Sequence, residues 1–329
     1  MRKSNRCLIT MKRAILLTIF AIIIIFYTAF EANSKHSYNP SLSTTGSLNT
    51  MSKPLKVKLQ YIAPQRCLSR FAGWLSENRT PWLKNYLIRY FLNRYDVDMK
   101  SAVVENPYDY PSFNSFFTRQ LKADARPIAQ DAQQVVSPAD GCISQIGKIN
   151  NYTLLQAKGF DFDLKGLLGG SDKLARLFQD GTFATIYLSP KDYHRVHMPL
   201  TGKLRETIFI PGKLFSVNQQ TASSVPQLFS RNERLVCIFD TEAGPMAVIL
   251  VGAMIVGSIN TVWHAHTTTN KIRTESYAGS IELARGSELG HFKLGSTVIV
   301  LFGKDKVSWL ENLQENATIQ MGEAMGETS

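Results

Sequence analysis

The sequence predicts an α+β fold, with N-terminal membrane-associating helices followed by an antiparallel β-rich domain. Apolar and aromatic residues recur at helical spacing between residues 55 and 99. After residue 124 the pattern changes to short apolar or alternating runs interrupted by Gly, Pro and Asn, which is typical of strands. Because the connections between these runs are mostly short, antiparallel pairing is favoured over repeated crossover units.

The composition allows a substantial core and points to an anionic partner. Of the 329 residues, 44% are hydrophobic and 19% are charged, which argues against disorder across the body of the chain. The formal net charge of +11 would attract either nucleic acid or an anionic membrane surface. Because the sequence contains no zinc-finger, RNP or helix-turn-helix signature, we expect no nucleic-acid partner and favour the membrane.

The four cysteines, Cys7, Cys67, Cys142 and Cys237, are widely spaced and form no CxxC pair. This spacing indicates neither a disulfide framework nor a zinc site. Cys142 and Cys237 fall in strand-like runs, so we expect them to be buried thiols that fill space in the core.

Residues 1–54 form the predicted N-terminal anchor and linker. Basic residues cluster before residue 14, and the uncharged run of residues 14–30 is just long enough to cross a bilayer. The positive-inside rule would then keep the N-terminus in the cytoplasm and export the rest of the chain. The alternative is that translation starts at Met51, which would remove the anchor. Residues 31–54 are rich in Ser, Thr, Asn and Pro, as in a flexible linker.

Residues 55–125 form the predicted amphipathic helical membrane-associating region. Pro64 and Pro81 divide its apolar pattern into short helices. Basic residues lie between the apolar ones, a pattern suited to an anionic membrane surface, and Trp74 and Trp82 favour an interfacial position. The alternative is a helical layer that packs on a sheet and exposes its basic face to solvent.

Residues 126–329 form the predicted β-rich domain. Candidate strands include residues 135–136, 142–146, 183–188, 235–239, 246–255 and 297–302. We expect the β-rich domain to end near Phe302. The chain contains no internal repeat and no glycine-rich phosphate loop.

Three short segments concentrate the residues that could carry chemistry. Residues 137–141 read SPADG, residues 193–199 read YHRVHMP, and residues 294–297 read LGST. Together they supply the Asp, His and Ser of an activated nucleophile, in which an imidazole takes the hydroxyl proton and a carboxylate fixes the tautomer. Such a set also arises by chance in enzyme-sized chains, so these residue types alone leave the function open.

Further segments appear in an order that resembles the phosphatidylserine decarboxylase family. They are residues 113–128 (FNSFFTRQLKADARPI), 211–218 (PGKLFSVN), 232–259 and 292–302 (FKLGSTVIVLF). The resemblance runs from about residue 56 to about residue 310 and is greatest to the bacterial and mitochondrial type, which carries LGST at its processing site. It makes the β-rich domain the catalytic one.

The resemblance implies that the chain cuts itself between Gly295 and Ser296. The Ser296 hydroxyl would attack the Gly295 carbonyl, with His197 as general base and Asp140 as its orienting carboxylate. Ser296 would become a covalent pyruvoyl group, the only cofactor expected. The products would be a large and a small chain that form a heterodimer, and two such units would associate further. A glycine at the cut suits a strained turn with an open carbonyl.

The same resemblance implies the reaction. The pyruvoyl group would form a Schiff base with phosphatidylserine and release carbon dioxide to give phosphatidylethanolamine, and His194 would protonate the resulting carbanion. Residues three apart on a strand point to opposite faces, so His194 and His197 reach one site only if their segment turns. Asp192 is either a second carboxylate that assists processing or a plain surface acid.

Substrate binding is expected at the turn formed by Phe215, Ser216, Val217 and Asn218, whose backbone amides could approach a phosphate. Tyr193 and Met198 are expected to be packing residues, and His291 a local hydrogen-bonding residue. The pair His264 and His266 lacks a third ligand, so we expect no metal. Its loop departs from the family pattern.

Two other functions stay open at this point, a serine hydrolase and a non-enzymatic membrane-surface protein. No GxSxG elbow surrounds Ser296, which disfavours the hydrolase. A membrane-surface protein would leave the three motif segments unexplained. Similarity to bacterial enzymes indicates the cell membrane, with the catalytic domain on the cytoplasmic face, whereas the charge bias of residues 1–30 indicates export.

Overall fold

The structure is a computed structural model that describes residues 53–157, 160–254, 259–264, 269–292 and 296–329. The predicted anchor and the alternative start at Met51 lie outside these ranges. Within them, no helix is both long and apolar enough to span a bilayer. The predicted end of the linker at residue 54 overlaps the first described helix, which begins at Lys53.

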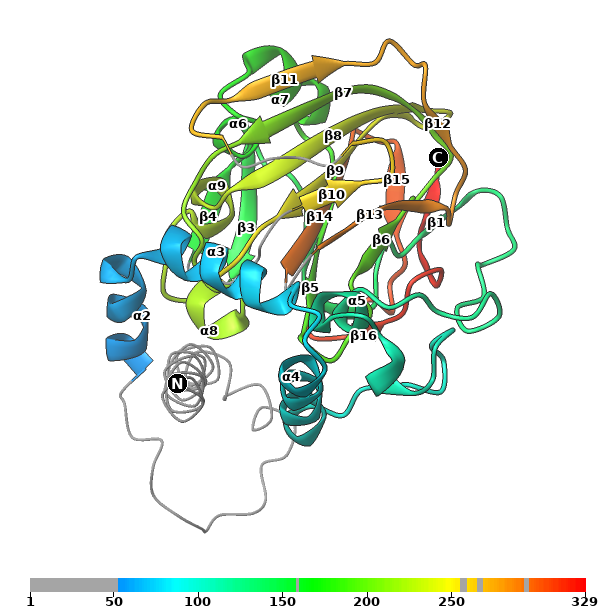
Figure 1. Ribbon diagram of the computed structural model, residues 1–329. Helices are drawn as coiled ribbons and strands as arrows, with labels where there is room; N and C mark the ends of the chain where they lie inside the picture. The colour runs from blue at the N-terminus through cyan, green and yellow to red at the C-terminus, as the bar shows by residue number, and fades with distance from the viewer. Residues whose placement is uncertain (1–52, 158–159, 255–258, 265–268, 293–295) are drawn as a thin grey trace, which may run out of the picture.

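Three helices lie along one side of the β-rich body (Figure 1). They are α2 (Lys53–Ile62), α3 (Gln65–Ser76) and α4 (Pro81–Arg94). Pro64 is the N-cap of α3, and Pro81 is the first residue of α4. Proline suits the start of a helix because its φ is already helical and the first turn does not need its missing N–H. The predicted division at the two prolines is confirmed.

Helix α4 packs through an aromatic cluster on the segment that follows it. This segment contains η1 (Pro107–Asp109) and α5 (Phe113–Phe117). The ring of Phe91 meets those of Phe113, Phe116 and Phe117 edge-on, at centroid distances of 5.4 to 5.9 Å. Each such pair contributes about 0.5–1.5 kcal/mol beyond its buried area. Helix α4 therefore packs on α5 through its aromatic face.

The largest sheet is built from strands far apart in the sequence. They are β2 (Gly141–Lys148), β5 (Thr182–Leu188), β7 (Gly202–Ile210), β8 (Arg234–Thr241), β9 (Gly244–Val251), β11 (Arg273–Ser276), β12 (Glu282–Leu283), β14 (Ser296–Phe302) and β16 (Thr318–Ile319). The order is β11–β7–β8–β9–β14–β5–β2–β16, with β12 also paired to β7. Every pair is antiparallel, which confirms the predicted antiparallel pairing.

Smaller sheets and short helices complete the described body. The sheets are β1 (Gln134–Val136) with β17 (Ala324–Thr328) and β15 (Val307–Trp309), β6 (Arg195–His197) with β13 (Glu288–Phe292) and β10 (Ile259–Thr261), and β3 (Thr153–Ala157) with β4 (Phe160–Asp163). The helices are α6 (Leu164–Leu167), α7 (Asp172–Phe178), α8 (Gln219–Ala222) and α9 (Leu228–Arg231).

The expectation that the β-rich domain ends near Phe302 is wrong. Strands β15, β16 and β17 follow Phe302, and they pair with one another or with β1 and β2. Each has only two to five residues, with no apolar run of its own. Their strand conformation depends on partners distant in the sequence, which a local pattern does not report.

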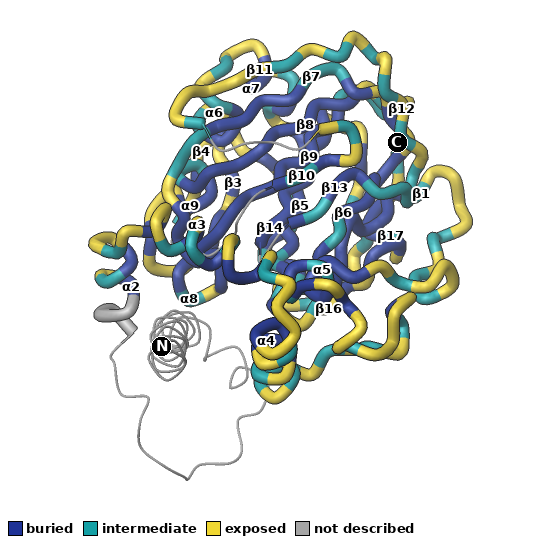
Figure 2. Tube along the Cα trace, in the orientation of Figure 1, coloured by how far each residue is buried: buried dark blue, intermediate teal, exposed yellow. Residues whose placement is uncertain are grey.

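Strand β14 runs through the centre of the core. It is hydrogen-bonded to β5 on one side and to β9 on the other, and all seven of its residues are buried. Figure 2 shows the central strands as a continuous buried layer, with the exposed residues in loops and on the outer helices. The first residue of this central strand is Ser296.

Candidate active site

Ser296 lies in the interior of the protein, at the start of β14. Its backbone pairs with Leu188, the last residue of β5. The side chain is fully buried, and its Oγ has no hydrogen-bond partner among the described residues. A buried hydroxyl without a partner is unusual, because it loses its bonds to water without replacement. Gly295, on the other side of the predicted cut, lies outside the described residues.

The loop between β5 and β6 lies next to Ser296 and to the end of β13. Two contacts locate it: Ser296 pairs with Leu188 at one end, and the Phe292 amide donates to the His194 carbonyl at 3.2 Å at the other. The loop is closed by the Ser189 amide, which donates to Asp192 at 2.7 Å. This arrangement brings residues 189–194 next to the predicted processing site.

His194 is fully buried in this loop and packs against Phe117 of α5, with ring centroids 4.1 Å apart. Its Nδ1 lies 2.8 Å from the Asp192 carbonyl oxygen, which can only accept, so Nδ1 carries a proton. Burial lowers the pKa of His194 to about 3. The ring is therefore neutral, and Nε2 holds a lone pair that has no partner among the described residues.

His197 also has a defined tautomer. Its Nδ1 donates to the Gly286 carbonyl at 2.8 Å, and its Nε2 lies 3.0 Å from the Tyr193 hydroxyl. Burial lowers the pKa of His197 and raises that of Tyr193, so a neutral ring accepts a hydrogen bond from a protonated phenol. The basic nitrogen of His197 is Nε2, and the group that orients the ring is a backbone carbonyl.

Asp140 does not occupy the orienting position expected for it. Arg126 donates to its carboxylate through Nε at 2.9 and 3.1 Å and through Nη2 at 2.5 Å, and the Met321 amide adds a bond of 2.9 Å. These donors satisfy the carboxylate, which explains why it makes no hydrogen bond to His197 among the described residues. The two segments are still adjacent, because the His197 amide donates to the Pro138 carbonyl at 2.7 Å.

Two family models match this chain. One, described as phosphatidylserine decarboxylase, matches residues 113–327, and the other, described as PSD, matches residues 55–96. The chain belongs to the phosphatidylserine decarboxylase family. A phosphatidylserine decarboxylase proenzyme of Ectopseudomonas mendocina is 54% identical over 282 residues, which are 84% of this chain and 99% of the relative. Proenzymes of Pseudomonas fluorescens (strain Pf0-1) and Bordetella avium are 53% and 55% identical, and the alignments cover 85% and 81% of this chain and 100% and 92% of the relatives.

The resemblance inferred from the motifs is thus confirmed. The longer match to the phosphatidylserine decarboxylase family includes all three chemistry-bearing segments, and the shorter one covers α2, α3 and α4 almost completely. The structure brings the three segments to one end of the central sheet, although it does not join Asp140, His197 and Ser296 by hydrogen bonds among the described residues.

The predicted substrate-binding turn is buried in this decarboxylase. Its members are 1–8% exposed: Phe215, Ser216, Val217 and Asn218. The Phe215 amide donates to Asn232 at 3.1 Å, and the Ser216 amide donates to Gln60 of α2 at 2.9 Å. The expectation that backbone amides of the turn approach a phosphate therefore does not hold for these two, because their hydrogens are already bound.

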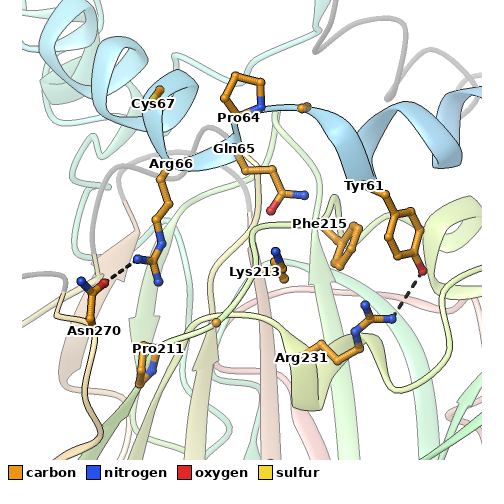
Figure 3. A pocket seen from close by; sticks show the side chains of 12 residues that line it. Tyr61, Pro64, Gln65, Arg66, Cys67, Pro211, Lys213, Phe215, Arg231 and Asn270 are labelled. Carbon is orange, nitrogen blue, oxygen red and sulfur yellow. Dashed lines mark hydrogen bonds between the residues drawn. The ribbon is translucent and has the colours of Figure 1, made fainter.

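A pocket of about 710 Å³ lies beside this turn, bounded by residues 61–67 and residues 211–215 (Figure 3). Its cations are Arg66, Lys213 and Arg231, and no carboxylate lines it. The Arg231 guanidinium lies over the rings of Phe215 and Tyr61, 5.2 and 5.5 Å from their centroids. The pocket is therefore electropositive and partly aromatic, which suits an anionic headgroup.

Sequence reasoning missed three residues that contact the candidate site. Tyr193 was expected only to pack, but its hydroxyl contacts the basic nitrogen of His197. Arg126 and Arg119 were noted only as letters of the segment 113–128, yet Arg126 binds Asp140 and Arg119 binds the Lys191 carbonyl at 3.2 Å. The available signal was the position of Arg119 and Arg126 after an aromatic run. Such a position indicates that an arginine is buried, and a buried cation needs a partner.

The remaining site expectations have mixed outcomes. Met198 is fully buried, as a packing residue should be. His291 bonds locally, with Nδ1 3.5 Å from Glu288. Asp192 is half-buried in the loop, and burial raises its pKa, so it is not a plain surface acid. His266 lies outside the described residues.

The cysteines partly follow their expectation. Cys237 is buried, but Cys142 is only half-buried because it lies on the β2 face that alternates with the core positions. Cys67 is exposed on α3, and Cys7 lies outside the described residues.

Proposed function

We propose that this protein is a phosphatidylserine decarboxylase that cuts itself between Gly295 and Ser296 and converts Ser296 into a pyruvoyl group. The observation that carries the proposal is the buried Ser296 hydroxyl, which has no hydrogen-bond partner among the described residues and lies at the start of the central strand, at the same end of the sheet as the loop that carries neutral His194. Membership of a family whose relatives are named proenzymes supports it.

Self-processing requires a base for Ser296. The hydroxyl adds to the Gly295 carbonyl, and the amide becomes an ester as the nitrogen of residue 296 takes a proton. Loss of the ester by β-elimination frees the chain that ends at Gly295, and hydrolysis of the remaining enamine releases ammonia and leaves the pyruvoyl group. We assign the base to His197, whose neutral Nε2 can accept the proton once Tyr193 gives up its hydrogen bond.

The residues present fit a pyruvoyl group at position 296. Ser296 and His194 are both fully buried, and His194 Nε2 is a proton acceptor without a partner among the described residues. When bound, the group supplies an electron sink for the loss of carbon dioxide from an amino acid headgroup. His194 is neutral, so it must first gain a proton at Nε2 before it can deliver one to the substrate α-carbon. The ammonium group of the incoming substrate is a suitable source, because it must lose a proton to react.

The two chains would stay together as a heterodimer. The small chain would begin with β14, which lies between β5 and β9, and would end with β17, which pairs with β1. Its central strand buries five large apolar side chains, Val298, Ile299, Val300, Leu301 and Phe302, each at most 1% exposed. Burial of each such side chain contributes about 1.5–3 kcal/mol, and a cut in the backbone before β14 removes none of these contacts. Further association of two such units stays a prediction.

The helical layer is the proposed membrane contact. Large apolar side chains protrude from α2, α3 and α4, with Ile62 78% exposed and Trp74 54% exposed. The cationic pocket opens beside them and would face the phosphates of an anionic bilayer. Location on the cytoplasmic face of the cell membrane stays a prediction.

Intact-mass spectrometry tests the processing proposal. The wild-type protein should yield two chains split at residue 295, with a small chain that carries a pyruvoyl group and no free amine. Ser296→Ala should yield one uncut chain. Thr297→Val is the matched control and should be cut, because the Thr297 hydroxyl is equally buried and also has no partner in the described part of the chain. An uncut wild-type chain, or normal cutting in Ser296→Ala, would refute the proposal.

Two histidine variants test the assignment of roles. His197→Gln should abolish cutting, and His194→Gln should be cut but release little carbon dioxide from phosphatidylserine. The opposite pattern would assign the processing base to His194, whose Nε2 has no partner within the described ranges.

Vesicle sedimentation tests the membrane contact. Ile62→Ser should weaken binding to anionic vesicles about tenfold, since burial of an isoleucine contributes on the order of 1–2 kcal/mol at an interface. Val262→Ser is the control, because Val262 is 52% exposed but follows β10 and does not belong to α2, α3 or α4. Equal effects of the two substitutions would contradict this docking face.

A further inference from the structure

Arg119 is a buried cation with an incomplete set of partners. It follows α5 and is only 3% exposed. One guanidinium nitrogen, Nη2, donates to the Lys191 carbonyl at 3.2 Å. The other two, Nε and Nη1, are buried and have no hydrogen-bond partner among the described residues. Together these two nitrogens leave three N–H donors unused.

A second buried arginine shows what a structural role requires. Arg234 is 2% exposed, and each of its three nitrogens donates to a backbone carbonyl, at 2.5 to 2.8 Å. Arg119 lacks such a cage. Arginine stays protonated in proteins even where burial lowers its pKa, so an unpaired buried guanidinium is costly. A group from outside the chain would remove that cost.

Arg119 lies next to the loop that carries His194, and this position indicates which group it could bind. Its Nη2 binds the loop that carries His194, and Phe117, two residues earlier, packs on the His194 ring at 4.1 Å. The same loop begins next to Ser296, which pairs with Leu188, and ends at His194, whose carbonyl accepts from the Phe292 amide. The unused donors of Arg119 and the unused acceptor of His194 therefore belong to one buried region.

Neighbouring acids do not neutralise Arg119. The Asp140 carboxylate is bound by Arg126 and the Met321 amide, and the Asp192 carboxylate accepts from the Ser189 amide. No salt bridge joins Arg119 to an acid in the described parts of the chain. The positive charge is left for a ligand.

We infer that Arg119 binds the carboxylate of the serine headgroup before it leaves as carbon dioxide. This inference rests on the proposed function. The carboxylate is bonded directly to the carbon that His194 is proposed to protonate, whereas the phosphorus of the headgroup is three bonds away. A cation next to His194 thus matches the carboxylate better than the phosphate. Charge-assisted hydrogen bonds of this kind are among the strongest in proteins.

The inference has a kinetic signature. The ion pair stabilises bound substrate, and its negative charge disappears when carbon dioxide leaves, so Arg119 should lower KM rather than raise kcat. The product lacks a carboxylate and therefore loses this anchor, which favours its release. Arg119 would be a residue that distinguishes phosphatidylserine from phosphatidylethanolamine.

The test compares Arg119→Gln and Arg119→Lys with Lys191→Gln, which removes an exposed cation from the same loop. In Arg119→Gln, KM for phosphatidylserine should rise about 10- to 100-fold, whereas inhibition by phosphatidylethanolamine should be unchanged. Arg119→Lys should recover part of the loss, and Lys191→Gln should match wild type. Normal cutting at residue 295, read on a gel, shows that each variant has folded.

Three results would overturn the inference. A parallel loss of affinity for phosphatidylethanolamine would mean that Arg119 binds a group common to substrate and product, such as the phosphate. Failure of both Arg119 variants to be cut, with Lys191→Gln cut normally, would mean that Arg119 supports the fold. Unchanged KM would mean that the carboxylate binds elsewhere. A wild-type protein that is not cut would instead refute the proposed function itself.

Discussion

Substitution of Leu301 by alanine would measure how firmly the central strand is held. Leu301 is fully buried in β14, and its backbone pairs with Phe183 on β5 and Ala247 on β9. Leucine-to-alanine changes in cores cost about 2.7–5.0 kcal/mol, and the cost rises with the cavity that remains. Because hydrogen-bonded strands hold β14 on both sides, the backbone cannot move in to close the space. We therefore expect a loss near the upper end of this range, about 4 kcal/mol.

The assay is urea unfolding of the Ser296→Ala protein, which keeps the chain single, with all variants compared at one protein concentration. The matched control is Leu155→Ala on β3, where the leucine is 43% exposed and the expected loss is below about 1 kcal/mol. If Leu301→Ala cost no more than Leu155→Ala, the buried central position of β14 would be wrong. The argument that burial retains the small chain would then fail as well.

Three further perturbations follow from the buried charges and thiols. Because the folded-state pKa of His194, about 3, lies below its ordinary value, the unfolded chain binds the extra proton between these values, and stability falls as pH drops below about 6.5. His194→Phe in the uncut protein should make the stability loss between pH 7 and 5, read from urea midpoints, shallower by up to about 1.4 kcal/mol per pH unit; an equal slope would contradict this. Arg126→Met should lower the free energy of unfolding by about 3 kcal/mol because it leaves Asp140 buried without its cation, and a loss below 1 kcal/mol in urea would refute the pairing. Cys67 should react with a maleimide in the native protein and Cys237 only after denaturation, because Cys237 is buried and burial raises the pKa of its thiol. Labelling of Cys237 in the native protein, read by peptide mapping, would contradict its burial.

The elements that could be predicted are those whose signal is local. The prolines at positions 64 and 81 mark helix starts through their own φ, and the apolar run in β14 is long enough to indicate a strand without reference to its partners. Strands β15, β16 and β17 carry no such signal, because pairing with β1, with β2 and with one another determines their conformation. The motif segments were found through family resemblance, since Asp, His and Ser alone do not show proximity.

The hydrogen bonds of the site could not be predicted because several of its partners are backbone groups. A sequence presents Asp140 as the natural partner for His197, since a carboxylate fixes an imidazole tautomer. In the structure the Gly286 carbonyl fixes it instead, and any residue type at that position would supply the same oxygen. The Tyr193 hydroxyl then covers Nε2, the nitrogen assigned to self-processing. Processing on this assignment needs a shift of one side-chain hydrogen bond, from Tyr193 to Ser296. Replacement of Tyr193 by phenylalanine removes the competing donor and leaves the bond from His197 to the Gly286 carbonyl in place. We therefore expect Tyr193→Phe to be cut faster than wild type in a time course on a gel. Slower cutting would contradict this and would mean that the phenol holds the His197 ring in position.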